Sequence, residues 1–125
     1  MSDSRQTRQR HARERHGRNA EELAKWALRL KGYRILAHRV RYNVGEIDLI
    51  AARGKTLAFV EVKARRTLGA ALDAVRPQAW MRIARTAEAW CAKHPDLADH
   101  DWRYDLMAVT PWRWPTHHPD YWRPD

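Results

Sequence analysis

The spacing of apolar residues along the chain predicts a helix over residues 17–31. Apolar side chains recur there at intervals of three and four, which is typical of a helix with one buried side. The expected buried positions are Ala20, Leu23, Ala24, Ala27 and Leu28. Gly32 follows directly and is the expected C-cap, because glycine readily adopts the positive φ that ends many helices.

A second helix is predicted from Pro77 to a point before Pro95. Proline suits the first turn of a helix, and the residue before a proline avoids helical geometry. Helical spacing recurs between them at Trp80, Ile83, Ala84, Ala87, Trp90 and Cys91. We therefore expect Trp80, Trp90 and Cys91 to lie in the core.

Four stretches predict strands, at residues 33–41, 44–52, 56–65 and 102–110. Gly54-Lys55 suits a two-residue hairpin loop, since a type II′ turn prefers glycine first. The register that follows places Asp48 opposite Glu61, and Glu46 opposite Lys63. The order α-β-β-β-α-β predicts an α/β fold in which a mixed sheet is flanked by helices.

The two ends of the chain differ from its middle. Residues 1–16 contain five arginines and two acids and almost no apolar residues, so we expect a disordered basic tail, either solubilising or contacting phosphates. Residues 111–125 contain four of the six prolines and three of the seven tryptophans, which favours an irregular strap packed on the domain. The 125 residues thus predict one domain, over residues 17–110, with two appended segments.

Charge narrows the possible partners. The net charge of +9 and the pI of about 10.4 favour a polyanion, either nucleic acid or an anionic membrane face. No apolar stretch is long enough to span a bilayer. Cys91 is the only cysteine, so the chain cannot form an internal disulfide. We expect a cytoplasmic protein whose leading partner is DNA, with RNA as an alternative.

Two facing carboxylates are the strongest chemical signal. Asp48 and Glu61 would repel each other inside a sheet, and a divalent cation such as Mg²⁺ or Mn²⁺ would give a reason to place them together. The carbonyl of Val62 could add a ligand. Lys63 lies on the same face as Glu61 and could orient water or neutralise charge on a phosphate. The alternative is that these residues are ordinary surface charges on a strand. The apolar neighbours of Asp48 and Glu61 argue against this interpretation, because they indicate that both strands are largely buried.

Other candidate residues have a structural and a functional interpretation each. Glu21 lies at the margin of the apolar stripe, either as a rim charge or as a third acid near the metal. Arg41, Arg65 and Arg66 are candidate phosphate contacts, although solvated arginines are common. Trp112 and Trp114 are weak candidates for stacking on bases, and Asp105 is expected to pair with a neighbouring arginine.

An ordered set of short motifs resembles a known family. The motifs extend over residues 17–110 and are Gly17-x-x-Ala20-Glu21-x-x-Ala24, Gly32-Tyr33, Gly45-Glu46-Ile47-Asp48-Leu49-Ile50-Ala51, Phe59-Val60-Glu61-Val62-Lys63-x-Arg65, Ala74-Val75 and Arg103-Tyr104-Asp105-Leu106. The chain resembles the YraN-like (UPF0102) family of small bacterial proteins in the PD-(D/E)XK nuclease superfamily, a family similar to archaeal Holliday-junction resolvases.

The resemblance implies a restriction-endonuclease-like fold, a nucleic-acid substrate and a divalent metal. It also implies an active site of Glu21, Asp48, Glu61 and Lys63. The chain departs from the family at Arg39, where relatives tend to have asparagine, and near Ala79, where they tend to have lysine. The second departure puts a substrate contact in doubt.

We therefore expect a metal-dependent endonuclease that hydrolyses branched or otherwise structured DNA. The alternative is a non-catalytic nucleic-acid-binding module on the same fold, and a protein bound to an anionic membrane face is a more distant third. A homodimer would suit a symmetric substrate.

Overall fold

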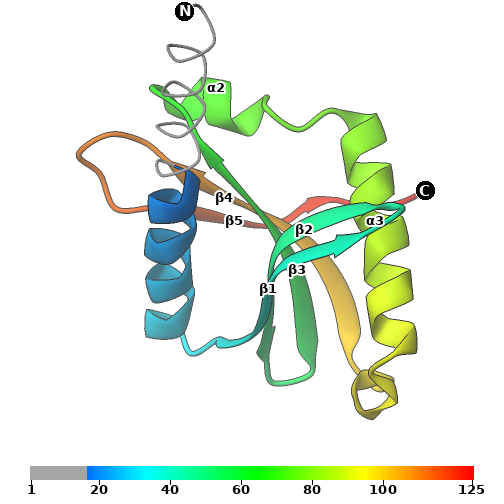
Figure 1. Cartoon of the computed structure of the whole chain (residues 1–125). Coiled ribbons are helices and arrows are strands. Elements are labelled where there is room, and N and C mark those ends of the chain that lie inside the picture. The colour runs from blue at the N-terminus through cyan, green and yellow to red at the C-terminus, as the bar shows by residue number, and fades with distance from the viewer. Residues whose placement is uncertain (1–16) are drawn as a thin grey trace, which may run out of the picture.

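The fold is a five-stranded mixed sheet with helices on both faces (Figure 1). The computed structural model describes residues 17–125, so the expectation for residues 1–16 lies outside it. The N-terminal helix covers residues 17–30, and the remaining elements are β1 Arg34–Tyr42, β2 Gly45–Arg53, β3 Thr56–Ala64, α2 Leu68–Leu72, α3 Pro77–Ala92, the 3₁₀ helix η1 Pro95–Leu97, β4 Asp101–Val109 and β5 Thr116–Trp122. Of the helices in this range, none has both the length and the apolar character that a membrane crossing needs.

The sheet order is β1-β2-β3-β4-β5, with β3 and β4 parallel and the other neighbours antiparallel. The predicted class, an α/β fold with a mixed sheet flanked by helices, is confirmed, and it is compatible with a restriction-endonuclease-like core. Pro77 begins α3 as predicted, and α3 ends three residues before Pro95.

The expected C-cap of the first helix is confirmed at Gly32, which has a φ of 90°. The Gly32 N–H donates to the Arg29 carbonyl and the Tyr33 N–H to the Leu28 carbonyl, both at 3.0 Å. These two bonds form a Schellman motif, which satisfies carbonyls at the helix end and turns the chain into β1.

The β2–β3 hairpin has the predicted register. Gly54 has a φ of 58°, and the ladder runs from Arg53↔Thr56 to Leu49↔Val60. The ladder ends there, immediately before Asp48 and Glu61. The expected pairing of Glu46 with Lys63 was wrong, because the paired part of β2 and β3 does not reach them and Arg41 Nε in β1 lies 3.5 Å from Glu46 Oε1.

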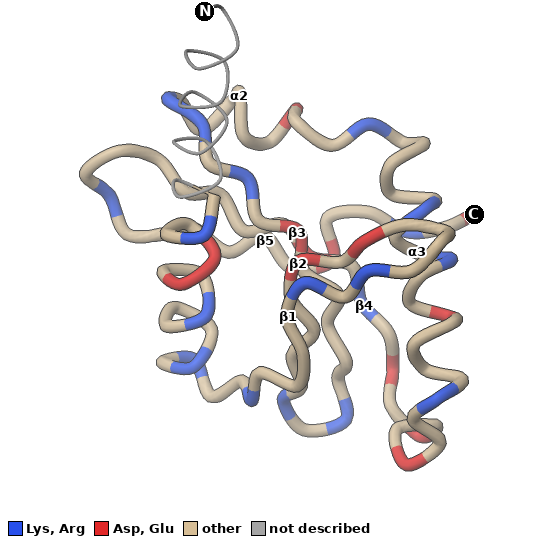
Figure 2. Tube along the Cα trace, viewed as in Figure 1, with Lys and Arg blue, Asp and Glu red and all other residues tan. Residues whose placement is uncertain are grey.

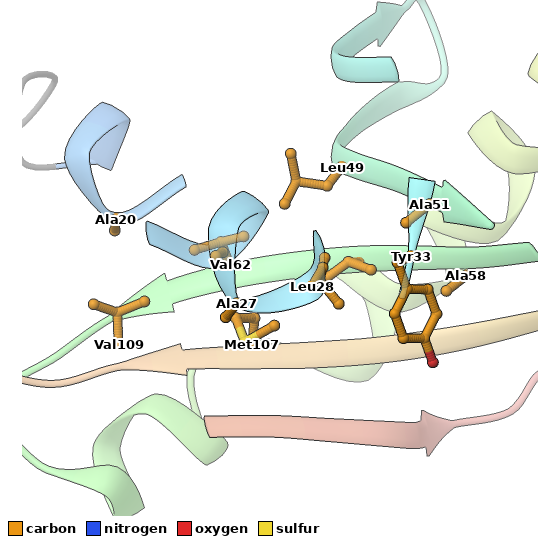
Figure 3. Close-up of a cluster of buried hydrophobic side chains, with 12 residues drawn as sticks. Ala20, Ala27, Leu28, Tyr33, Leu49, Ala51, Ala58, Val62, Met107 and Val109 are labelled. Atoms are coloured by element: carbon orange, nitrogen blue, oxygen red, sulfur yellow. The ribbon is translucent and has the colours of Figure 1, made fainter. Parts of the chain in front are cut away.

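The sheet separates two cores. The N-terminal helix packs on one face, where Leu28, Val62 and Met107 belong to one buried cluster (Figure 3). On the other face α3 packs Trp80 and Trp90 against Phe59 and its neighbours, as predicted for both tryptophans. Cys91 is half-buried against the same core, and burial raises the pKa of its thiol to about 11.

One residue of the first helix is not where the pattern placed it. Leu23 is 41% exposed, whereas the spacing predicted a buried side chain. It lies at the edge of the buried stripe and lines a groove with the loop between β4 and β5 instead of packing on the sheet.

The C-terminal segment is a strand where we expected an irregular strap. Residues Thr116–Trp122 form β5, an edge strand in which Pro119 is tolerated because an edge residue need not donate to the ladder. The register shifts between Tyr104 and Leu106, and Asp120 has a φ of 56° at this irregularity. Trp122 is half-buried and stacks on Trp80, but Trp112 and Trp114 are exposed, which the expectation of a packed strap did not foresee.

Candidate active site

Asp48 and Glu61 lie where β2 and β3 stop pairing. Asp48 Oδ2 accepts a hydrogen bond of 2.8 Å from the Val62 N–H, and the Asp48 N–H donates to Glu61 Oε1 at 3.4 Å. Each carboxylate therefore takes the place of a missing ladder carbonyl on the opposite strand. This exchange satisfies backbone donors that would otherwise be unpaired, and it fixes both side chains.

The backbone of β1 is distorted beside Asp48. His38 pairs with Leu49 and Val40 with Ile47, so Arg39 is the β1 residue beside Asp48. Arg39 has a φ of 52°, a left-handed conformation that is unusual for a long side chain and costs on the order of 1 kcal/mol.

Arg39 connects the strand to the first helix. Its Nε donates to Glu21 Oε2 at 2.8 Å, and both side chains are partly buried. The strained strand position is therefore held by an ion pair that also brings Glu21 to the same side of the molecule as Asp48.

Negative charge at the carboxylate pair is only partly compensated. Burial raises the pKa of Glu61 well above its ordinary value, the negative charge of Asp48 raises it further, and Lys63 opposes both from 3.8 Å. Burial also raises the pKa of Asp48, the Val62 N–H lowers it, and the charge of Glu21 raises it. Figure 2 shows these acidic positions of β2 and β3 close together, with basic positions of β1 beside them.

A pocket of about 410 Å³ opens beside Asp48. Its wall includes Glu21, Glu46 and three arginines, which are Arg18, Arg39 and Arg41. The pocket is large enough to admit a phosphate group, and its three arginines are balanced by three acids, Glu21, Glu46 and Asp48.

The structure brings together part of the predicted site. Asp48, Glu61 and Lys63 form one cluster, and Glu21 reaches the pocket on which Asp48 opens. Val62 is buried, and its backbone N–H donates a hydrogen bond to Asp48. Arg41 lines the pocket.

Some predicted site residues lie away from this cluster, and some residues of the pocket were not predicted. Arg65 and Arg66 are exposed and line a second groove, beside the loop between β4 and β5. Arg18 and Arg39 also belong to the pocket wall, although neither was predicted as a site residue and Arg39 was noted only as a departure from the family. A basic residue near Glu21 was visible in the sequence at Arg18, but no local signal indicated the left-handed backbone at Arg39.

Two carboxylates are the side-chain donors that this site offers to a divalent cation. Within residues 17–125, no group of three or more His, Cys, Asp or Glu side chains is placed to hold a metal ion. Two carboxylates are nevertheless sufficient protein ligands for Mg²⁺, which prefers hard oxygen donors and retains several waters. Asp48 and Glu61 therefore fit such an ion, and their only partly compensated charge is the observation that favours one.

A second buried carboxylate is structural. Asp105 accepts hydrogen bonds from Arg103 Nε at 2.8 Å and Nη2 at 2.7 Å, which confirms the predicted pairing with an arginine. It also accepts from His117 Nε2 at 2.8 Å and from the Asp120 N–H at 2.9 Å. Asp105 thus attaches β5 to β4 through hydrogen bonds and ion pairs.

Comparison with known proteins places the chain in a family. Residues 20–109 match the model of the uncharacterised protein family UPF0102. A UPF0102 protein of Chelativorans sp. (strain BNC1) is 57% identical over 103 residues, which cover 82% of this chain and 83% of the relative. A UPF0102 protein of Paramagnetospirillum magneticum is 45% identical over 129 aligned positions, covering 100% of both chains. A match to the family model over most of the chain, together with relatives this similar over most or all of their length, means that the chain belongs to the uncharacterised protein family UPF0102.

Proposed function

We propose that this protein is a metal-dependent endonuclease that hydrolyses phosphodiester bonds in DNA, with branched or otherwise structured DNA as its substrate. The observation that carries the proposal is the pairing of buried Glu61 with half-buried Asp48, whose charge is incompletely neutralised beside a pocket with three arginines in its wall. The backbone hydrogen bonds orient the two carboxylates, but they leave the repulsion between them unexplained.

The carboxylate oxygens of Asp48 and Glu61 would hold the cation, with the Val62 carbonyl as a further candidate ligand. When bound there, Mg²⁺ or Mn²⁺ supplies Lewis-acid chemistry and neutralises phosphate charge. The backbone hydrogen bonds between Asp48, Glu61 and Val62 keep both side chains oriented, so little reorganisation is needed before the reaction.

Lys63 and the arginines have separate roles. Lys63 is half-buried beside Glu61, from where its ammonium group can orient the attacking water or neutralise charge that develops on the phosphate. Arg18 and Arg41 lie on the accessible rim of the pocket and would position the phosphate. Glu21 would act mainly through its charge on Asp48 and through Arg39.

The arrangement is similar to that of the PD-(D/E)XK superfamily. An acidic residue on one strand, an acidic-x-lysine motif on the next, and a glutamate on the preceding helix occur here as Asp48, Glu61-x-Lys63 and Glu21. This similarity, and the resemblance to Holliday-junction resolvases, supports the choice of structured DNA as the substrate.

One observation favours a second candidate function, a nucleic-acid-binding module without catalysis. Glu21 is engaged by Arg39, and the described residues offer two clustered carboxylates instead of three. A binding module would keep the arginines and the exposed aromatic residues but would have no use for the buried acid pair.

The test is a cleavage assay with linear, flap and four-way-junction DNA in Mg²⁺, Mn²⁺ or EDTA. Asp48→Asn and Lys63→Ala are compared with Glu88→Gln, which removes the same charge as Asp48→Asn from the exposed side of α3. We expect metal-dependent cleavage by the unchanged protein and by Glu88→Gln, and a loss of at least about a hundredfold in Asp48→Asn.

Cleavage that persists in EDTA, or that Asp48→Asn and Glu88→Gln support equally, would contradict the proposed site. Binding of DNA without cleavage in any metal would select the binding module.

A further inference from the structure

A second concave surface lies at the loop between β4 and β5. It has a volume of about 710 Å³, and the residues that define it are Leu23, Arg65, Arg66, Trp112, Arg113 and Trp114. We call it the Trp–Arg groove. Figure 1 shows the loop (orange) projecting beside the first described turns of the N-terminal helix (blue).

The apolar residues of the groove are unusually accessible. Trp112 is fully exposed, Trp114 is 55% exposed and Leu23 is 41% exposed. Leaving indole rings in water is unfavourable, and contiguous apolar surface of this kind typically marks a binding site. Trp112 also has a φ of 63°, which few bulky residues adopt and which is often found at functional sites.

The charge of the groove identifies the chemistry of its occupant. Arg65, Arg66 and Arg113 line it, and among the described lining residues there is no aspartate or glutamate. Flat aromatic rings interleaved with guanidinium groups complement a chain of bases joined by phosphates. A duplex keeps its base faces stacked inside, so only unpaired nucleotides can offer them to Trp112 and Trp114.

The groove lies at the same end of the sheet as the carboxylate pair. Arg65 follows β3 and its N–H donates to the Val109 carbonyl at the end of the parallel strand β4. Four residues of extended chain separate it from Glu61, a distance of about 13 Å. One DNA strand can therefore reach both surfaces within a few nucleotides.

We propose that the Trp–Arg groove binds an unpaired stretch of a DNA strand that continues into the duplex held at Asp48 and Glu61. This inference rests on the proposed function and narrows its substrate class to DNA with a flap or other unpaired nucleotides. The bases stack on Trp112 and Trp114, and the three arginines contact the phosphates. Stacking is tolerant of base identity, so the groove recognises DNA structure and not sequence.

Binding measurements in EDTA test the groove separately from cleavage. The full chain is titrated with single-stranded DNA, with a blunt duplex, and with the same duplex bearing an unpaired strand. The double variant Trp112→Ala/Trp114→Ala is compared with Trp26→Ala, which removes a tryptophan that is 56% exposed on the N-terminal helix outside the groove.

We expect the double variant to lose roughly tenfold or more in affinity for the single strand and the flap. Its affinity for the blunt duplex should change less than about twofold, and Trp26→Ala should bind all three DNAs like the unchanged protein. Because the replaced rings are exposed, the thermal midpoint should be preserved, and Arg113→Ala provides a second variant that should weaken flap binding by several-fold.

The groove proposal is overturned if the double variant binds all three DNAs normally, if it loses equally on the blunt duplex, or if Trp26→Ala has the same effect. It is also overturned if sedimentation shows that the double variant dissociates a dimer, because the groove is then an interface between copies. Failure to cleave DNA, with the expected binding pattern intact, contradicts the endonuclease alone.

Discussion

Two carboxylates, Asp48 and Glu61, meet where β2 and β3 separate, and Lys63 forms an ion pair with Glu61 while its charge also lowers the pKa of Asp48. Burial raises the pKa of both acids, the charge of Asp48 raises that of Glu61, and the charge of Glu21 raises that of Asp48. The ionised pair therefore opposes folding in the absence of a cation. Sites of this kind often exchange stability for function. The cost should be measurable in the protein without metal.

Glu61→Gln removes one of the two charges and keeps an oxygen that can accept from the Asp48 N–H. In EDTA at neutral pH we expect the free energy of unfolding to rise by about 0.5–2 kcal/mol, measured by urea denaturation. Added Mg²⁺ should raise the thermal midpoint of the unchanged protein and of Glu88→Gln, but not that of Glu61→Gln. A destabilised Glu61→Gln would show that this carboxylate is a net structural contact.

Asp105 is buried like Glu61 but has the opposite electrostatic environment. Burial alone would raise its pKa, but the hydrogen bonds from His117, Arg103 and the Asp120 N–H outweigh burial and lower it. The folded state therefore binds a proton more weakly than the unfolded chain does. The carboxylate stabilises the fold above its ordinary pKa of 3.8, and this stabilisation is lost as the pH falls through the lowered value.

We expect Asp105→Asn to lower the free energy of unfolding by about 3–5 kcal/mol at neutral pH, since it leaves Arg103 partly buried without its counterion. The difference from the unchanged protein should shrink as the pH is lowered below about 4. Urea denaturation across this range measures it, with Asp99→Asn, an exposed partner of Lys55, as the control that should change little. A difference that is independent of pH would mean that shape, and not charge, makes the Asp105 contacts important.

At the scale of elements, short sequence motifs predicted those features that depend on contacts between residues close in the chain. Gly32 and Gly54 have the positive φ that their turns require, so the end of the first helix and the hairpin register could be predicted from a few residues. That register in turn brought Asp48 and Glu61 together. The class of the fold followed from the order of these elements.

The remaining features depend on contacts between distant segments. β5 is held on the sheet by Asp105, in the middle of β4, which accepts hydrogen bonds from His117 and from the Asp120 N–H. The proline-rich sequence of the segment gives no local indication of this strand. The left-handed Arg39 is likewise fixed by Glu21 in another element. The groove at Trp112 exists only because the loop after β4 lies beside Leu23.

The start of β2 depends on a glycine that contacts α3. Gly45 has a φ of 154°, and a Cβ there would lie 2.9 Å from Thr86 Oγ1 and 3.2 Å from the Arg82 carbonyl. Gly45→Ala should therefore lower the free energy of unfolding by about 1–3 kcal/mol, because α3 has to move away from the strand that carries Asp48.

Gly69→Ala is the matched control, since Gly69 lies in α2 with open space around it. It should raise stability by about 0.4–1 kcal/mol, because alanine suits a helix better than glycine. Thermal and urea unfolding of both variants measure the difference. Equal effects at the two positions would contradict close packing between β2 and α3.

At the scale of the whole molecule, the net charge of +9 would attract DNA to any face, whereas the proposed function requires a particular one. Arg65 and Arg66 lie at the end of the sheet that carries the carboxylate pair and the Trp–Arg groove. Arg34 begins β1 near the opposite, hairpin end, and Arg85 lies on the exposed side of α3. Removing either pair lowers the net charge equally, from +9 to +7.

The two double variants, Arg65→Ala/Arg66→Ala and Arg34→Ala/Arg85→Ala, separate local from global attraction. If DNA docks at the carboxylate end, the first variant loses two phosphate contacts, and the slope of log K against log salt concentration falls in magnitude by about 1.8. The second should change this slope by less than about 0.5, because its arginines lie away from the docked strand. Titrations of flap DNA at several salt concentrations give both slopes. Equal changes would mean that DNA is held by net charge alone, and the orientation assumed for cleavage at Asp48 and Glu61 would then have no support.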